Sequence, residues 1–302
     1  MKTQEKTVTL CRDRRNFLRK MAFGSARLSL GLLGRTACSP GFTESRGHRL
    51  NVSPVTGETR VSFATGNDRR KLVYQVLQPF REEMREAIGD RQVVVKLNCV
   101  GQKGNPLMVT HPDAVRAVLD FLKPIYPRTV IIGESTIQNR NNVVMGSPLK
   151  IPRLNINEKA KMHAGSGTPK FINHNLFLIA HRVRPDFAVL DGFEGVEGNG
   201  PANGDPVDHC VALAGPDFLA VDRIGTEIMG IPWEWEDIGY LNFCADAGLG
   251  QGDRSKITII GPDIGSHVRK YRLHDNIAWQ LTWKDDLALA NEHELKNLRN
   301  QQ

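Results

Sequence analysis

The chain has 302 residues, of which 40% are hydrophobic and 24% are charged, and its formal net charge is +7. A chain of this length and apolar content can bury a sizeable core, which excludes a disordered protein. Residues 1–38 hold nine of the 40 Lys and Arg residues but only two of the 33 acidic residues, so the rest carries 31 of each sign. The basic charge therefore belongs to the N-terminus, and nucleic acid is not expected as a partner.

The first 38 residues are typical of a twin-arginine export signal. Arg14 and Arg15 precede Phe17-Leu18, a mildly apolar stretch follows over 21–34, and small residues come at 36–38. This stretch is too short and too polar to span a bilayer, so no transmembrane segment is expected. We expect recognition by the twin-arginine export machinery, followed by cleavage and a periplasmic location.

Two residues of the N-terminus suit other interpretations. Arg27 interrupts the apolar stretch, as it would in a basic amphipathic helix on a cytosolic protein. Cys38 follows small residues, as the lipid-modified cysteine of a lipoprotein does, but Arg35 stands where an apolar residue is wanted. Export without a lipid anchor is therefore the favoured interpretation.

Residues 39–58 are rich in Gly, Ser, Pro, Thr and Arg and are expected to form a linker. Beyond them, apolar strand patterns alternate with amphipathic helical patterns. The expected strands are 60–66, 93–97, 130–133, 187–191, 210–213 and 256–260, and the expected helices are 68–88, one opening at 110–113, 171–184, 217–229 and 234–247. This alternation predicts an α/β fold with a mostly parallel sheet and helices on both faces. We expect a single α/β domain over 59–265 and a polar C-terminal tail over 266–302, helical near 285–298.

The cysteines give no indication of a metal cluster. Cys11, Cys38, Cys99, Cys210 and Cys244 include no C-x-x-C pair, so the sequence encodes neither an iron–sulfur motif nor a zinc knuckle. The three that remain after cleavage near residue 38 are expected to be buried free thiols.

Three carboxylates lie three residues apart in the glycine-rich segment 191–201, which we expect to be a loop beyond the carboxyl end of a strand. Ligands of α/β sheets usually bind there, and glycines let the backbone fold closely round them. The carboxylates suit a divalent cation or proton transfer, while a tight connector with solvated or capping carboxylates is the alternative. The candidates are Asp191, Glu194 and Glu197 for catalysis, and Gly198, Asn199 and Gly200 for cofactor binding, with no metal assigned.

Four further candidates follow or end neighbouring strands. Lys96 lies on an apolar strand, where a buried ammonium needs a partner or an anionic ligand, or else reaches water at the strand end. His111 opens a helix, where it could bind an anion, transfer protons or simply cap the helix. We name Lys96 and His111 as catalytic candidates and Asn98 and Glu134 as cofactor-binding candidates.

Several of these residues carry a resemblance to a known family. Lys96-Leu97-Asn98, Thr110-His111-Pro112 and Gly133-Glu134-Ser135 resemble the N-terminal motifs of the domain-of-unknown-function family 362. Six further segments resemble the C-terminal half and the closing segment of this family: 184–192, 197–201, 220–222, 229–230, 238–241 and 248–250. The resemblance spans about residues 58–261, with Glu-Gly-Asn-Gly-Pro at 197–201 as its most specific part, and it implies neither a substrate nor a reaction.

One departure from the family concerns the segment after Ser135. Members are similar to one another in having a stretch there that ends Pro-x-x-Lys-Thr-His, followed by a Lys-Asn pair and a Gly-rich turn. Here only 141–146 resembles the end of that stretch, and it begins six residues after Ser135. A strand and a helix are therefore expected to be missing, through an internal deletion or an error in the gene model. Family members are often exported by twin-arginine leaders, and some add ferredoxin-like cysteine motifs, which this chain lacks.

The sequence leaves three functional interpretations open. The first is an exported enzyme that acts on a small molecule at the acidic Gly-rich segment. The second is a non-catalytic module that binds a ligand or handles a cofactor for a periplasmic redox system. The third is a degenerate relative without activity.

Overall fold

The computed structural model describes residues 55, 57–98, 106–133, 184–200, 203–231 and 238–284, with 169, 173, 176, 177, 179 and 180. The export signal, nearly all of the linker, Glu134, the stretch after Ser135 and the helical stretch near 285–298 lie outside these residues. The helix expected over 171–184 is described only in part. Within the described part of the chain, no helix is long and apolar enough to cross a membrane.

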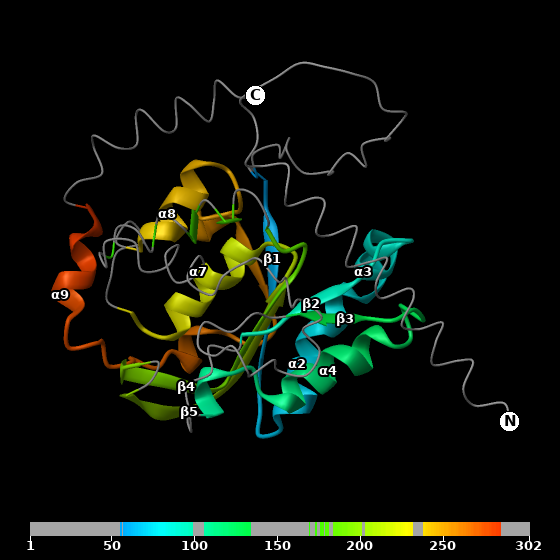
Figure 1. Ribbon diagram of the computed structural model, residues 1–302, viewed down its shortest axis with the longest axis horizontal. Coiled ribbons are helices and arrows are strands. Elements are labelled where there is room, and N and C mark those ends of the chain that lie inside the picture. The colour runs from blue at the N-terminus through cyan, green and yellow to red at the C-terminus, as the bar shows by residue number, and fades with distance from the viewer. Residues whose placement is uncertain are drawn as a thin grey trace, which may run out of the picture.

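A four-stranded mixed sheet forms the centre of the fold (Figure 1), with the strands in the order β4-β5-β1-β6. The strands are β1 (Thr59–Thr65), β4 (Ala188–Asn199), β5 (Asn203–Gly215) and β6 (Ile257–Ile260). β1 pairs parallel with β6 and antiparallel with β5, which pairs antiparallel with β4. A separate parallel pair consists of β2 (Val94–Lys96) and β3 (Ile131–Gly133).

The predicted α/β class is confirmed, but the sheet is parallel only in part. Three residues, 200–202, connect β4 to β5, and so short a connection can only return the chain antiparallel. A parallel neighbour would need a crossover of a dozen residues or more. The sequence pattern marked only 187–191 and 210–213 as strands, and the structure extends both into one long hairpin.

Helices cover both faces of the sheet, as predicted. Alternate residues of β1 and β5 point to opposite faces: Val61 and Phe63 pack with α7 (Phe218–Ile228), whereas Ala64 packs with α2 (Arg69–Leu77). α4 (Pro112–Leu122) belongs to the same core cluster as α2 and Ala64. α8 (Gly239–Asp246) packs beside α7 on the other face. Figure 1 shows α7 and α8 on one side of β1 and α2 and α4 on the other.

The helix expected over 68–88 is broken into α2, a 3-10 turn at Gln78–Phe80 and α3 (Arg81–Ile88). Pro79 explains the break, because proline lacks the amide proton that a continuous helix requires. The remaining elements are short: 3-10 turns η3 (Pro106–Met108), η5 (Arg254–Lys256), η6 (Gly265–His267) and η7 (Leu281–Lys284), and helix α9 (Ile277–Gln280).

Asp217 ties the start of α7 to the closing segment of the domain. Its Oδ1 accepts from the amides of Leu219 (2.9 Å) and Ala220 (3.1 Å), and its Oδ2 accepts from the amide of Gln251 (2.7 Å). A Cβ added to Gly250 would lie 2.5 Å from Asp217 Oδ1, so only glycine allows this close approach. Both oxygens of one buried carboxylate are therefore used to join two elements.

We expect Asp217→Ala to lower the free energy of unfolding by about 2–4 kcal/mol, because it removes a helix cap and leaves buried amides without an acceptor. Asp68 provides the matched control, since it caps α2 with one bond to the Lys71 amide from a partly exposed position. Asp68→Ala should lower the stability clearly less in the same urea denaturation experiment. Equal losses for the two variants would contradict the joining role of Asp217.

Candidate functional site

The predicted acidic loop is in fact the outer strand of the hairpin. Asp191, Glu194 and Glu197 lie on β4 and pair across the sheet with Ala212, Asp208 and Asp205 of β5. β4 runs to Asn199, and a turn begins only at Gly200. The loop prediction was wrong because the glycines serve close packing within a strand, which local sequence does not distinguish from loop flexibility.

A β-bulge determines which carboxylates meet. The pairing register shifts between Gly192 and Glu194, where Cys210 of β5 adopts a left-handed conformation (φ 58°). This irregularity brings Asp191 and Glu194 to the same cation. From Glu194 to Asn199 the register is regular, so side chains alternate and Glu197 faces the side opposite to Glu194.

Arg69, the first residue of α2, lies between Asp191 and Glu194. Its Nε is 3.3 Å from Asp191 Oδ1 and its Nη2 is 3.5 Å from Glu194 Oε2, while its guanidinium carbon lies 4.9 Å from the centre of the Phe193 ring. Asp191 Oδ1 also accepts from the Phe193 amide (3.2 Å). The exposed fraction of the side chain is 11% for Arg69, 17% for Asp191 and 34% for Glu194, so Glu194 is the member that solvent reaches best.

The segment between β2 and α4 brings Asn98 and His111 to one place. The amide of Asn98 donates to Thr110 Oγ1 (2.9 Å), and the amide of Thr110 donates to the carbonyl of Asn98 (2.7 Å). His111 follows as the N-cap of α4, and its Nδ1 accepts from the Asp113 amide (3.2 Å). The 3-10 turn η3 of the same segment contacts β4, whereas the contacts given for Asn98 and His111 stay within their own segment.

Lys96 is exposed at the end of β2, where its Nζ donates to the carbonyl of Leu97 (2.9 Å). The strand 93–97 was expected to be buried, and this prediction was wrong for one of its two faces. Val93 and Val95 pack against the α2–α4 core, whereas Val94 is 60% exposed. Because the described helices cover β2 and β3 from the α2–α4 side, alternate residues of β2 point away from these helices. Lys96 therefore follows the second interpretation, a lysine that reaches solvent.

Glu197, Gly198 and Asn199 contact another part of the chain. We call residues 268–276 the C-terminal strap. Arg272 of the strap donates its amide to Glu197 Oε2 (3.0 Å) and accepts from the Gly198 amide (2.8 Å). Asn199 donates to Asp275 Oδ2 (2.7 Å) and accepts from the Asp275 amide (3.0 Å). The strap lies where the sequence suggested a cofactor.

Among the residues that the structure describes, no three His, Cys, Asp or Glu side chains are grouped closely enough to hold a metal ion. The three carboxylates considered for a divalent cation are divided between the two faces of the hairpin, as Asp191 with Glu194 and Glu197 alone. Cys210 and Cys244 are free thiols, the former half-buried and the latter buried, and Cys99 lies outside the described residues.

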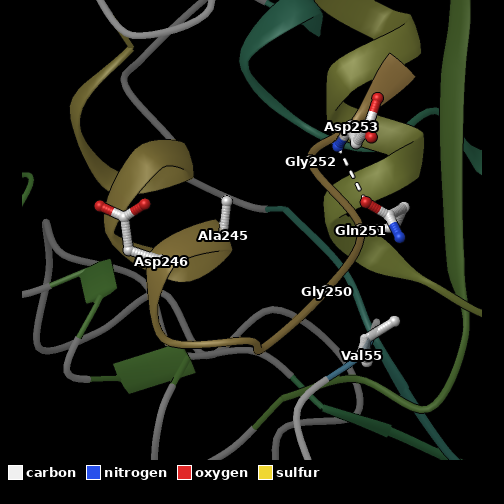
Figure 2. A pocket seen from close by; sticks show the side chains of 7 residues that line it. All are labelled: Val55, Ala245, Asp246, Gly250, Gln251, Gly252 and Asp253. Atoms are coloured by element: carbon white, nitrogen blue, oxygen red, sulfur yellow. Dashed lines mark hydrogen bonds between the residues drawn. The ribbon is translucent and has the colours of Figure 1, made fainter. Parts of the chain in front are cut away.

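A pocket of about 340 Å³ lies at the end of α8, away from these carboxylates. Figure 2 shows Ala245 and Asp246 of α8 on one side and the loop from Gly250 to Asp253 on the other, where the Asp253 amide donates to Gln251 Oε1 (2.9 Å). A second hollow of about 430 Å³ lies along α2 and α4, lined by Asp68, Arg70, Lys71, Tyr74 and Asp120.

Sequence reasoning missed a half-buried polar pair between α7 and α8. Tyr240 Oη donates to Asp222 Oδ2 (3.1 Å), and burial raises the pKa of Asp222 to about 6 because it disfavours the charged carboxylate. Cys244 lies one turn after Tyr240 on α8. Burial and the nearby Asp222 raise the pKa of this thiol to about 12. The position of Asp222 on the apolar side of α7, beside Val221 and before Ile224, was the available indication.

We expect the Asp222 carboxyl to make stability fall as the pH rises. Its pKa is raised from 3.8 to about 6, so the stabilisation of the protonated form is complete below about pH 4 and is lost as the pH passes 6. Relative to Asp222→Asn, the wild type should lose about 2–3 kcal/mol of unfolding free energy between pH 4 and pH 7.5. Urea denaturation across this range measures it. Exposed Asp246→Asn serves as the control, and parallel curves for wild type and Asp222→Asn would contradict the expectation.

Comparison with known proteins bears on the hairpin directly. Residues 151–227, which include β4, β5 and most of α7, match the family model described as Domain of unknown function (DUF362). The resemblance is thereby confirmed for this segment, while the Lys96 and His111 motifs lie outside the match. The thylakoid-associated protein sll1697 of Synechocystis sp. is 38% identical over 68 residues, 22% of this chain and 21% of that protein. The aligned segment therefore spans about a fifth of this relative, and no solved structure matches.

Proposed function

Taking the family match over residues 151–227 as the premise, we propose that this chain is an exported protein that binds a small molecule without transforming it. The binding edge is the place where β4 meets the segment between β2 and α4, and its side chains are Asp191, Glu194, Arg69, Asn98 and His111. The observation that carries this proposal is the pairing of Arg69 with both carboxylates.

The pairing favours recognition over acid–base catalysis. A general base must be free to take a proton from the substrate, whereas Asp191 and Glu194 already share one guanidinium. A fixed guanidinium with two carboxylates presents donors and acceptors in a set geometry, which suits the orientation of a polar ligand.

The segment between β2 and α4 supplies the remaining polar groups of the binding edge. The paired backbone bonds between Asn98 and Thr110 hold this segment in place, and the His111 side chain is 42% exposed beside it. Glu194 is the most exposed carboxylate of the Arg69 pairing. A ligand that reaches both Glu194 and His111 could exchange hydrogen bonds with each without entering the core.

Export is proposed from residues 1–38. The twin-arginine route carries proteins that have folded in the cytoplasm, often with a cofactor in place, which agrees with a module that binds a ligand or handles a cofactor for a periplasmic redox system. We expect Arg14→Lys with Arg15→Lys to keep the protein in the cytoplasm, although the charge is unchanged, because the export machinery reads the arginine pair. Cell fractionation measures the result, with Arg12→Lys as the control. Periplasmic recovery of the double variant would contradict this route.

Glu194 and Glu197 offer a matched test of the binding edge, since both lie on β4 but on opposite faces. We expect native mass spectrometry with elemental analysis of the purified wild type to show a retained small molecule. Glu194→Gln should lose it and Glu197→Gln should keep it, because only Glu194 belongs to the binding edge. Chemical conversion of the retained molecule during incubation would instead establish an enzyme. A wild type that retains nothing, and that no compound of a broad metabolite panel stabilises thermally, would favour the degenerate relative.

A further inference from the structure

Three consecutive residues of β5 are bonded to parts of the chain outside the hairpin, at the point where the pairing with β4 is irregular. The carbonyl of Asp208 accepts from Arg269 Nη1 (2.8 Å). The carbonyl of Cys210 accepts from the amide of Gly66 (3.1 Å). Between them, both ring nitrogens of His209 are bonded. The bulge is therefore held from outside the β4–β5 ladder.

The two bonds of His209 define the state of its ring. Its Nε2 lies 2.8 Å from the carbonyl of His267 and donates to it, because a carbonyl can only accept. Its Nδ1 lies 3.0 Å from Tyr271 Oη and, in the neutral ring, accepts from that hydroxyl. Both sides of the imidazole are thus used, and the ring fixes the β5 backbone that carries it.

The partners of His209 are themselves fixed to the core. The amide of Tyr271 donates to the carbonyl of Met229 at the end of α7 (2.9 Å), and a second backbone bond joins α7 to the strap two residues earlier. The Tyr271 ring is buried. The ring of His267 packs against Phe63 of β1, with 5.5 Å between the ring centroids. His209 therefore ties the bulge to the core between the sheet and α7.

The bulge needs this support because it is strained. Cys210 has a φ of 58°, in the left-handed region that residues with a side chain rarely adopt. A residue other than glycine stays in that conformation only where its surroundings hold it, and such positions cluster at functional sites. β-Bulges are likewise frequent beside active sites, where they re-aim side chains. The strain at Cys210 thus points to a use for the bulge.

We infer that His209 is a positioning residue of the binding edge. It fixes the bulge, and the bulge brings Asp191 and Glu194 to one guanidinium, that of Arg69. Both ring nitrogens of His209 are used by the closing part of the chain, so His209 acts on the two carboxylates through the backbone. The inference rests on the proposed function, since it concerns the same binding edge.

Hydrogen exchange on the full chain, followed by NMR, tests this inference at two amides. The Gly66 amide donates to Cys210 in the bulge, and the Phe193 amide donates to Asp191 in the binding edge. His209→Ala should speed the exchange of both amides by at least about tenfold, because it removes two hydrogen bonds that hold the bulge closed.

Three controls separate positioning from a general loss of stability. The Gln251 amide, which donates to the buried Asp217, should keep its wild-type rate in His209→Ala. His274→Ala removes a histidine of the strap that accepts from the Asn276 amide, and it should leave the bulge and binding-edge amides unchanged. His209→Gln should restore part of the protection, because its side-chain nitrogen can take the position of Nε2 and donate to the same carbonyl.

Two patterns of exchange in His209→Ala would overturn the inference. Faster exchange at Gly66 alone would mean that the bulge opens without disturbing the binding edge, and equal acceleration of all three amides would mean a general loss of stability. Should His209→Ala fail to fold, Tyr271→Phe removes only the hydroxyl bonded to Nδ1. It should speed the Gly66 and Phe193 amides by roughly fivefold, as one lost hydrogen bond implies, and unchanged rates would reject the positioning role.

Native mass spectrometry separates this inference from the proposed function. The small molecule that purifies with the wild type should be lost from His209→Ala, as from Glu194→Gln, and kept by His274→Ala. Its retention by His209→Ala together with its loss from Glu194→Gln would refute the positioning role. A wild type that retains nothing would count against the proposed function alone, and the exchange of the Gly66 and Phe193 amides then decides the positioning role by itself.

Discussion

The register of the β4–β5 hairpin is the constraint on which the rest of the structure depends. The bulge between Gly192 and Glu194 lets Asp191 and Glu194 share Arg69, and the regular pairing beyond it turns Glu197 to the other side. A slip of one residue would exchange the two faces, moving Val211 and Leu213 away from α7 together with the charges. The apolar core therefore fixes the register, and the register decides which polar groups meet.

The acidity of the hairpin draws distant parts of the chain onto it. Glu194 lies opposite Asp208, and Glu197 lies opposite Asp205, so the isolated hairpin would repel itself along its length. Arg69 at the start of α2 pairs with Glu194, and Arg272 of the strap pairs with Asp205. The two arginines reduce the repulsion and come from distant parts of the sequence. The carboxylates that suggested a cation site are thus matched with cations of the chain itself.

The sequence predicted the carboxylates of the candidate site but neither Arg69 nor the grouping of its residues. The polar residues of the Glu-Gly-Asn-Gly run stand out in any reading of the sequence, yet the partners of Glu197 and Asn199 come from Arg272 and Asp275, about 75 positions away in a tail without clear periodicity. Arg69 looked like one charge among many on an amphipathic helix. Asp222 and Tyr240 meet only because α7 and α8 pack together, and a single carboxyl on an apolar helix face does not reveal its partner.

By itself, the sequence determined the α/β class of the fold and several of its elements, because helical and strand periodicity are local properties that residues such as Leu72, Val73 and Val76 record directly. It also indicated a family resemblance over about 58–261, which is confirmed for residues 151–227, and it offered capping as one of three roles for His111, the role seen at the start of α4. Only the tertiary structure decided that β4 and β5 form an antiparallel hairpin, which face each carboxylate takes, and which arginine it meets. Those outcomes depend on contacts between residues far apart in the chain, and no local pattern encodes the distance between them.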